Sequence, residues 1–201
     1  RGPSRSLSID EVVRQARSLV WKGFREIVLT GVNVGDYGTK IDTSFHALLQ
    51  SLHAVDGLDR LKISSIEPNL LTDEIIALAA SSDRLMPHFH IPLQSGSDAT
   101  LRQMRRRYQS ANYRDRVEAV LRALPHAAIG VDVITGFPGE SEAHFMETVR
   151  FVEDLPIAYL HVFTYSERAD TPALDMAAAI PREERMRRTH VLRRLSASKR
   201  T

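Results

Sequence analysis

The sequence contains no cysteine among its 201 residues. Disulfides and thiolate-bound metal ions or clusters are therefore excluded within this chain. It also has no run of about 18 consecutive apolar residues, the length that a membrane-spanning helix needs. Residues 1–6 carry charges with no apolar stretch behind them, so they do not form a signal peptide, and the missing initiator Met indicates a trimmed or processed chain. We expect a cytoplasmic protein with no membrane partner.

Neither sign of charge dominates, because 27 Lys and Arg residues stand against 25 Asp and Glu residues, for a net charge of +2. This balance does not by itself identify a nucleic-acid-binding protein. Basic residues are concentrated locally, over 102–107 and over 182–200. Such runs usually form solvated helix faces, and the alternative is a surface that contacts phosphates.

Hydrophobic residues recur at helical spacing and at strand spacing in alternation. Helices are predicted over residues 9–20, 44–55, 72–80, 98–104, 112–124, 141–155 and 182–197. Strands are predicted over residues 27–30, 61–66, 88–93, 127–135 and 158–165. Ser8 and Glu11 form a predicted capping box, Pro181 begins the last helix, and Pro92 must lie at a strand end. The alternation predicts an α/β fold with a parallel sheet, either a (β/α) barrel or an open doubly wound sheet.

Polar, glycine-containing or acidic turns follow all five predicted strands. They occupy residues 30–38, 64–69, 92–98, 135–140 and 164–168. One such turn is weak evidence, since Gly and Ser are ordinary turn residues. Five of them predict a ligand site, because parallel α/β folds bind ligands at the carboxyl ends of their strands.

Several turn residues suit a small polar ligand. The glycines at 31, 96, 136 and 139 allow backbone groups to approach a ligand closely. Asn33 and Gln94 each offer a donor and an acceptor. Glu67 and Asp132 could accept hydrogen bonds from ribose hydroxyls or an ammonium group, although Asp132 could equally be a buried carboxylate bonded to neighbouring strand groups.

His88 and His90 are the best basis for a rival enzyme class. Residues two apart on a strand share a face, so both imidazoles could bind one metal ion, as in barrel metallohydrolases. The other histidines are scattered, and no second ligand cluster accompanies the pair. The turn at residues 136–140 is not a P-loop, since it lacks the Lys-Ser/Thr ending, and no G-x-S-x-G motif occurs. A non-enzymatic RNA-binding module built on the basic helix is a third hypothesis.

Three longer motifs carry a more specific pattern. They span residues 90–108 (HIPLQSGSD, then Leu101, Met104, Arg106 and Tyr108), 132–140 (DVITGFPGE) and 162–173 (VFTYSER, then TPA). With LTGVNVGDYG at 29–38, their order and spacing resemble the radical S-adenosylmethionine (SAM) core of the methylthiotransferases over essentially the whole chain. Thr164 and Asp170 depart from this pattern where many members have Pro and Gly, which we expect to alter a loop.

The resemblance implies a partial (β/α) TIM-like barrel of the radical SAM type, forming a single domain over 1–201. It further implies that the cluster-binding cysteines precede Arg1 and that the N-terminal methylthiotransferase domain and C-terminal TRAM domain are absent. In the intact enzyme, a [4Fe–4S] cluster and SAM generate a radical that allows a methylthio group to be inserted into the substrate. We therefore expect no catalytic residue, no metal ligand and no activity in this fragment.

By position on the motifs, the resemblance implies a set of SAM-binding residues. Thr30, Gly31 and Asn33 would hold the amino-acid end. Those near the ribose or carboxylate would be Glu67, Gln94 and Ser95, and those bordering the adenine would be Gly136 and Tyr165. The implied partners are tRNA and a protein that reduces the cluster. The turns at 31–35 and 65–68 are most similar to the branch acting on threonylcarbamoyl-adenosine next to the tRNA anticodon, with a ribosomal-protein methylthiotransferase as the alternative.

Overall fold

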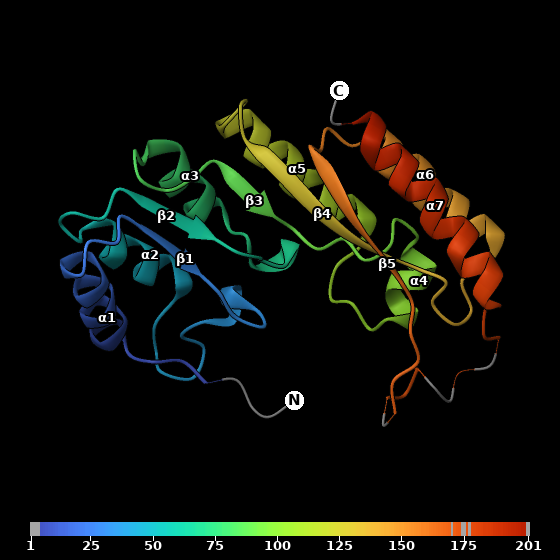
Figure 1. The fold of residues 1–201 in the computed structure, drawn as a ribbon, viewed down its shortest axis with the longest axis horizontal. Helices are drawn as coiled ribbons and strands as arrows, with labels where there is room; N and C mark the ends of the chain where they lie inside the picture. The colour runs from blue at the N-terminus through green and yellow to red at the C-terminus, as the bar shows by residue number, and fades with distance from the viewer. Residues whose placement is uncertain (1–4, 170, 174–175, 177, 200–201) are drawn as a thin grey trace. The chain divides into compact units, whose positions relative to one another are not determined.

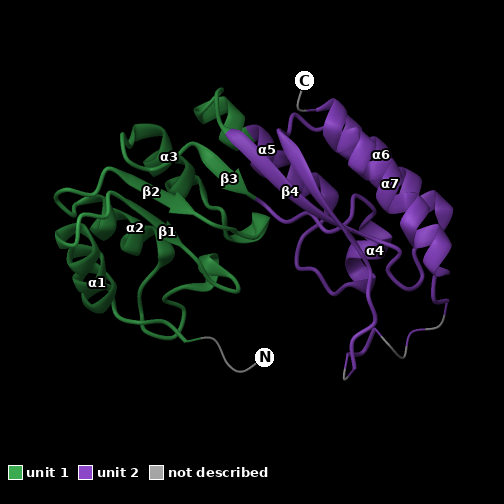
Figure 2. Cartoon of the chain, viewed as in Figure 1, with its two compact units in different colours: residues 1–90, 119–127 green, residues 91–118, 128–201 purple. Residues whose placement is uncertain are grey.

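The structure, a computed structural model, describes residues 5–169, 171–173, 176 and 178–199. Helices and strands alternate along the chain (Figure 1). The chain divides into two compact units, which Figure 2 colours separately. Unit 1 comprises residues 1–90 and 119–127, and unit 2 comprises residues 91–118 and 128–201. None of the helices in the described part of the chain combines the length and the apolar character needed to span a bilayer.

Unit 1 contains three α-helices, three strands and two short 3₁₀-helices. These are α1 (Ile9–Trp21), β1 (Glu26–Leu29), η1 (Val34–Asp36), α2 (Phe45–His53), β2 (Arg60–Ile63), η2 (Pro68–Leu70), α3 (Asp73–Ser81) and β3 (His88–His90). β1 and β2 pair in parallel, with Glu26 opposite Arg60. The predicted capping box is confirmed, since Ser8 Oγ accepts from Glu11 N–H and Glu11 Oε2 accepts from Ser8 N–H.

The core of unit 1 lies under its helices. α2 buries Leu48, Leu49 and Leu52 at the spacing of one helix face. Full burial of a leucine side chain contributes about 1.5–3 kcal/mol, so this face fixes α2 against its unit. α2 contacts η1 in the segment after β1, and that segment carries three of the predicted ligand residues.

Unit 2 contains two strands and four helices, of which α5 runs over the boundary into the residues assigned to unit 1. These are α4 (Asp98–Gln103), α5 (Ser110–Ala123), β4 (Ala128–Thr135), α6 (Glu142–Asp154), β5 (Tyr159–Thr164) and α7 (Arg182–Ser198). β4 and β5 pair in parallel from Gly130 opposite Tyr159 onward. α7 packs along β5, and Ser196 Oγ accepts from Leu160 N–H at 2.9 Å. As predicted, Pro181 stands at the start of α7.

The predicted α/β fold with five strands is confirmed, with strands in two small sheets. Two strands end three residues earlier than predicted: the strand predicted over 61–66 ends at Ile63, and that predicted over 88–93 ends at His90. The strands predicted over 27–30 and 158–165 each end one residue early. Pro92 explains the early end at His90, because it has no N–H to donate. The chain nevertheless continues beside β4, since Leu93 N–H donates to the Asp132 carbonyl at 3.1 Å. The predicted single domain stays a prediction.

Candidate functional site

A cleft of about 680 Å³ in unit 1 lies at the carboxyl end of β1. Thr30, Gly31 and Asn33 all line it, so the structure brings together the three residues predicted for the amino-acid end of SAM. The N-terminal segment closes one side: Tyr37 Oη donates to the Leu7 carbonyl at 2.7 Å. Burial, and then the charge of Glu11, raise the pKa of Tyr37.

Asn33 is the most informative residue of this cleft. Its Nδ2 donates to Asp36 Oδ2 at 2.9 Å. Its Oδ1 is buried and has no hydrogen-bond partner among the described residues. An unsatisfied buried acceptor costs about 1–3 kcal/mol, and a ligand that donates a hydrogen bond, such as an ammonium group, would remove this cost.

A second cleft, of about 410 Å³, lies in unit 2 at the carboxyl ends of β4 and β5. Two of the predicted residues, Gln94 and Tyr165, line it. Gln94 has φ +69, a left-handed conformation that is unfavourable for a residue with a side chain and often marks a functional position. Two backbone hydrogen bonds to β4 hold it there, from its N–H to the Asp132 carbonyl and from Ile134 N–H to its carbonyl.

Tyr165 lines the second cleft and is held by its neighbours. The ring packs edge-on against Phe137, with 5.5 Å between the centroids, and the Arg185 guanidinium lies 5.4 Å from its centroid. The hydroxyl oxygen is buried and lacks a hydrogen-bond partner among the described residues. A flat ring with an unsatisfied hydroxyl suits the edge of an aromatic heterocycle.

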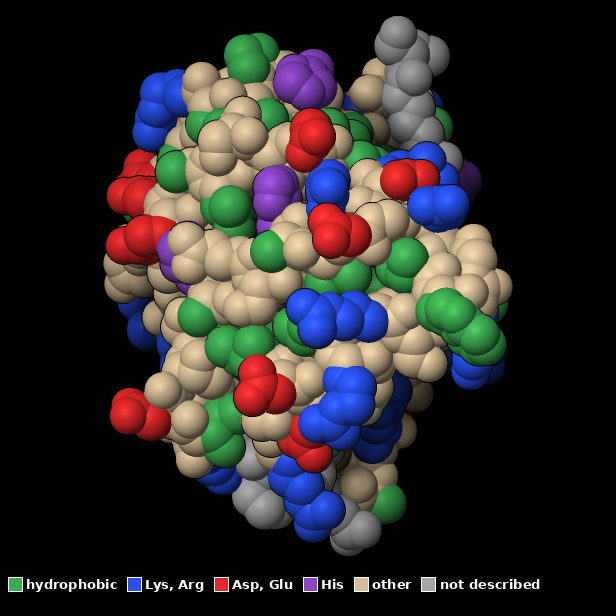
Figure 3. Space-filling model, turned by 90° about the vertical axis from the view of Figure 1, so that its left-hand side faces the viewer, with side chains coloured by type: hydrophobic (Ala, Val, Ile, Leu, Met, Phe, Trp, Pro, Cys, Tyr) green, Lys and Arg blue, Asp and Glu red, His purple; other side chains and the backbone are tan. Residues whose placement is uncertain are grey.

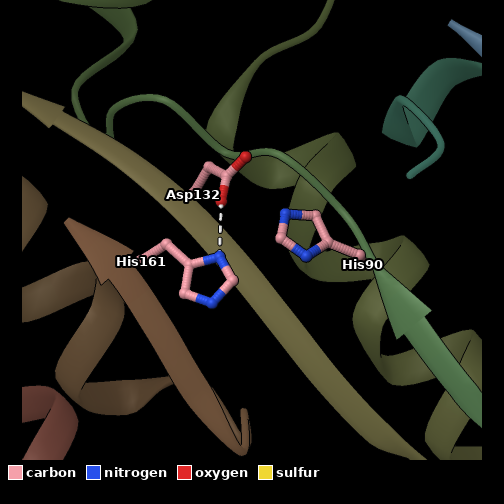
Figure 4. A group of neighbouring side chains, drawn as sticks. All are labelled: His90, Asp132 and His161. Carbon is pink, nitrogen blue, oxygen red and sulfur yellow. Dashed lines mark ion pairs between the residues drawn. The ribbon is translucent and has the colours of Figure 1, made fainter. Parts of the chain in front are cut away.

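Asp132 also lines the second cleft, and its carboxylate pairs across the sheet. His161 stands opposite Asp132 in the β4–β5 register, and its Nδ1 lies 3.3 Å from Asp132 Oδ1 (Figure 4). The carboxylate therefore faces the imidazole of a neighbouring strand, and the Asp132 side chain is half-buried rather than buried. His88 is the first histidine of the predicted metal-binding pair, and it belongs to no group of three potential metal ligands among the described residues. Burial, Lys62 and His90 lower its pKa.

The other predicted ligand residues have roles inside the protein. Ser95 is fully buried, and its Oγ shares a hydrogen bond of 3.0 Å with Thr148 Oγ1. Gly136 has φ +75, and a Cβ there would lie 2.3 Å from Arg185 Cγ. Its N–H is already bonded to Glu140 Oε2 at 2.7 Å. Glu67 is half-buried at the start of η2, and it does not line the unit 1 cleft.

Three of the four turn glycines are closed off by protein atoms. A Cβ at Gly96 would meet Phe151 Cβ at 2.8 Å, and one at Gly139 would meet the Gln103 amide at 3.1 Å. Together with Gly136, these glycines permit close packing inside unit 2. Gly31 differs, because it is exposed within a cleft.

A buried ion network, which the sequence did not reveal, holds the turn after β4. Arg188 on α7 is 4% exposed and Glu140 is 1% exposed. Arg188 Nη1 donates to Glu140 Oε2 at 2.8 Å, and Arg188 Nε donates to Glu184 at 2.7 Å. Burial raises the pKa of Glu140, against the effect of the hydrogen bonds from Arg188 and Gly136.

The basic run over 182–200 is therefore only partly a solvated helix face. Arg185 and Arg188 are buried, and Arg185 pairs with Glu167. Arg187 is exposed yet bonded to Glu142 and Glu184, and its hydrogen bonds are the main cause that lowers the pKa of Glu184 to about 2. Elsewhere, on the face drawn in Figure 3, basic and acidic side chains lie interspersed.

Comparison with known families identifies the family of this chain. Residues 1–152 match the family described as the Radical SAM superfamily. The chain belongs to the radical SAM superfamily. Both clefts lie at the carboxyl ends of parallel strands, the edge at which α/β barrel enzymes bind their ligands.

Curated relatives refine this assignment. The chain is 44% identical, over 98% of its own length, to the threonylcarbamoyladenosine tRNA methylthiotransferase MtaB of Bacillus subtilis, of which it covers 44%. It is 36% identical over its whole length to MtaB of Aquifex aeolicus, covering 49% of that protein. It is 40% identical over 91% of its length to the tRNA-2-methylthio-N(6)-dimethylallyladenosine synthase of Streptomyces viridosporus, covering 37% of it. The chain thus spans less than half of these relatives, and the predicted resemblance to the methylthiotransferases is confirmed.

Solved structures confirm the fold. Coproporphyrinogen III oxidase (HemN) from Escherichia coli, a radical SAM enzyme, superposes with a TM-score of 0.70 at 11% identity, covering 95% of this chain and 46% of HemN. A radical SAM methyltransferase from Sphaerobacter thermophilus gives 0.57 at 16% identity, covering 96% of this chain and 57% of that protein. The predicted partial TIM-like barrel of the radical SAM type is therefore correct.

Proposed function

We propose that this chain is the SAM-binding core of an enzyme that adds a methylthio group to threonylcarbamoyl-adenosine in tRNA. The observation that carries the proposal is the 44% identity to MtaB over 98% of the chain. The whole protein would work in the cytoplasm, with tRNA as substrate and a reductant protein as electron donor. Membership of the radical SAM superfamily also favours this function over a metallohydrolase that uses His88 and His90.

The unit 1 cleft is our candidate for the amino-acid end of SAM. The orphaned Asn33 Oδ1 would accept a hydrogen bond from the ammonium group, with Thr30 and Gly31 beside it. In unit 2, Gln94 and Tyr165 remain the candidates for ribose or carboxylate contacts and for the adenine edge, respectively. Ser95, Gly136 and Glu67 would act by shaping the backbone around these clefts.

The chain supplies no thiolate to an iron–sulfur cluster, because it contains no cysteine. SAM and a [4Fe–4S] cluster, when bound in the intact enzyme, supply the radical chemistry. The residues described here would bind SAM, orient it and exclude water from it. We expect no methylthiotransferase activity from the 201 residues alone.

A reaction test uses the full-length protein, reconstituted with iron and sulfide under anaerobic conditions. Synthetic anticodon stem–loops carrying either threonylcarbamoyl-adenosine or dimethylallyl-adenosine are incubated with SAM and a reductant. Mass spectrometry of the digested nucleosides should detect the methylthio product only from the threonylcarbamoyl RNA. Product from the dimethylallyl RNA alone, or from a ribosomal protein alone, would contradict the proposal.

A binding test addresses the cleft itself. In the same protein, Asn33→Ala should weaken SAM binding by about tenfold or more, because hydrogen bonds to charged groups contribute about 1.5–3 kcal/mol. Asn69→Ala is the matched control, since Asn69 is exposed in unit 1 outside this cleft. Equal dissociation constants for parent and Asn33→Ala would remove Asn33 from the SAM site.

A further inference from the structure

A third cavity, of about 440 Å³, lies in unit 2 beside the cleft that holds Tyr165. The two hollows share three wall residues, Ile134, Thr171 and Ala173, so they adjoin. The turn after α4, residues 103–106, forms one side of the cavity. Its volume is in the range of small-molecule sites.

The lining of this cavity combines apolar surface with positive charge. Met104 and Phe137 are among its apolar residues, Arg105 and Arg106 are its charged ones, and none of its described lining residues is acidic. Arg106 already takes part in an interaction within the protein. The Arg105 guanidinium makes no hydrogen bond or ion pair with any described residue, so it is available to a ligand.

The backbone at Arg105 makes this arginine unusual. Arg106 N–H donates to the Leu101 carbonyl and Arg105 N–H donates to the Arg102 carbonyl, both at 2.9 Å. This is the hydrogen-bond pattern of a Schellman motif, whose left-handed position usually holds Gly. Arg105 occupies that position with φ +55. A side chain there costs roughly 1–2 kcal/mol, and retention of such a cost is a recognised sign of a functional residue.

We propose that Arg105 binds the carboxylate of the threonylcarbamoyl group, and so helps to select this substrate; this inference rests on the proposed function. A threonylcarbamoyl group ends in a carboxylate, whereas a dimethylallyl group is an uncharged hydrocarbon. A cavity lined by Arg105, and by no acidic residue among those that the structure describes, favours the first, because arginine and carboxylate form paired, charge-assisted hydrogen bonds. Both the threonylcarbamoyl carboxylate and an RNA phosphate are anions, so a phosphate is the other group that Arg105 could bind.

The test measures binding by the full-length protein, so it does not depend on turnover. Two anticodon stem–loops are compared, one with the natural threonylcarbamoyl carboxylate and one in which a carboxamide replaces it. The parent should bind the acid about tenfold or more tightly than the carboxamide, as expected for hydrogen bonds to a charged group. Arg105→Gly and Arg105→Gln should bring this preference to within about twofold.

Two features keep the result interpretable. Arg105→Gly suits the left-handed backbone, so the variant should be at least as stable as the parent. Arg107→Gln is the matched control, because Arg107 is exposed on the same turn but does not line the cavity, and it should keep the full preference.

Two outcomes would overturn the inference. Arg105 variants could keep the parent's preference for the acid, or they could weaken acid and carboxamide equally with a shallower salt dependence, which would indicate a phosphate contact. Turnover distinguishes the two proposals. Methylthio transfer with an unchanged acid preference would leave the proposed function standing and refute the role of Arg105. If Arg105 variants lose the preference for the acid but the parent transfers no methylthio group, the role of Arg105 would stand and the proposed function would be refuted.

Discussion

Replacing Arg188 by alanine should strongly destabilise unit 2. The Arg188 side chain is 5% exposed and its partner Glu140 is 1% exposed. Without Arg188, the Glu140 carboxylate keeps only the Gly136 N–H among its described hydrogen-bond donors. Removing one partner of a buried ion pair costs about 3–5 kcal/mol, because an uncompensated charge remains buried. We expect the free energy of unfolding to fall by this amount at pH 8.

The assay is urea unfolding followed by far-UV circular dichroism. Fluorescence is a poor reporter, since Trp21 belongs to unit 1 and is 87% exposed. Arg187→Ala is the control, because Arg187 also pairs with Glu142 and Glu184 but is 48% exposed. An exposed pair of this kind contributes about 0–1 kcal/mol.

The pH dependence provides an independent check. Burial raises the pKa of Glu140 in the folded protein, so its ionised form opposes folding. Stability is therefore lost as pH rises from the ordinary glutamate value through this raised pKa. Loss of Arg188 should raise the pKa further, so the variant's deficit should be smaller at pH 5 than at pH 8. A deficit under about 1 kcal/mol, or the same deficit at both pH values, would refute the reasoning.

Three further predictions concern stability. Gly136→Ala should lower the free energy of unfolding by at least about 1–3 kcal/mol because of its left-handed backbone, and by more because the new Cβ would clash with Arg185. Gly139→Ala should lower it less, because the new Cβ would meet only the end of a flexible side chain. Urea unfolding midpoints compare the two variants. Ser8→Ala should lower stability by about 1 kcal/mol through loss of the cap of α1, and faster amide exchange in that first turn would report it. Tyr113→Phe should cost about 1 kcal/mol, since its buried hydroxyl donates to a backbone carbonyl at 2.7 Å; an unchanged urea midpoint would contradict this.

The order of helices and strands was predictable because hydrophobic spacing reports local structure directly. The caps followed for the same reason, since Ser8 and Glu11 are three residues apart and bond to each other. Strand ends were less predictable: β2 ends at Ile63, where two consecutive serines interrupt the apolar alternation, although the strand was predicted to continue to Ile66.

The site was predictable only where a residue's role is local to its turn. Thr30, Gly31 and Asn33 directly follow β1, and they share one cleft as expected. Ser95 has the composition of a ligand residue, but its hydroxyl bonds to Thr148, which is distant in sequence. The buried Arg188 could not be distinguished from its exposed neighbour Arg187, because adjacent arginines in a basic run do not show which one meets a carboxylate.

α7 lies beyond the end of the family match, yet it packs against residues inside that match. The family match ends at residue 152, whereas the arginine that neutralises Glu140 lies at position 188. The segment matched by the family is therefore shorter than the segment whose side chains pack around the turn after β4. A recombinant chain ended at the family limit would lack β5 and α7, and would leave an unneutralised carboxylate beside the turn after β4. Domain limits for expression of this core should therefore be placed after Ser198.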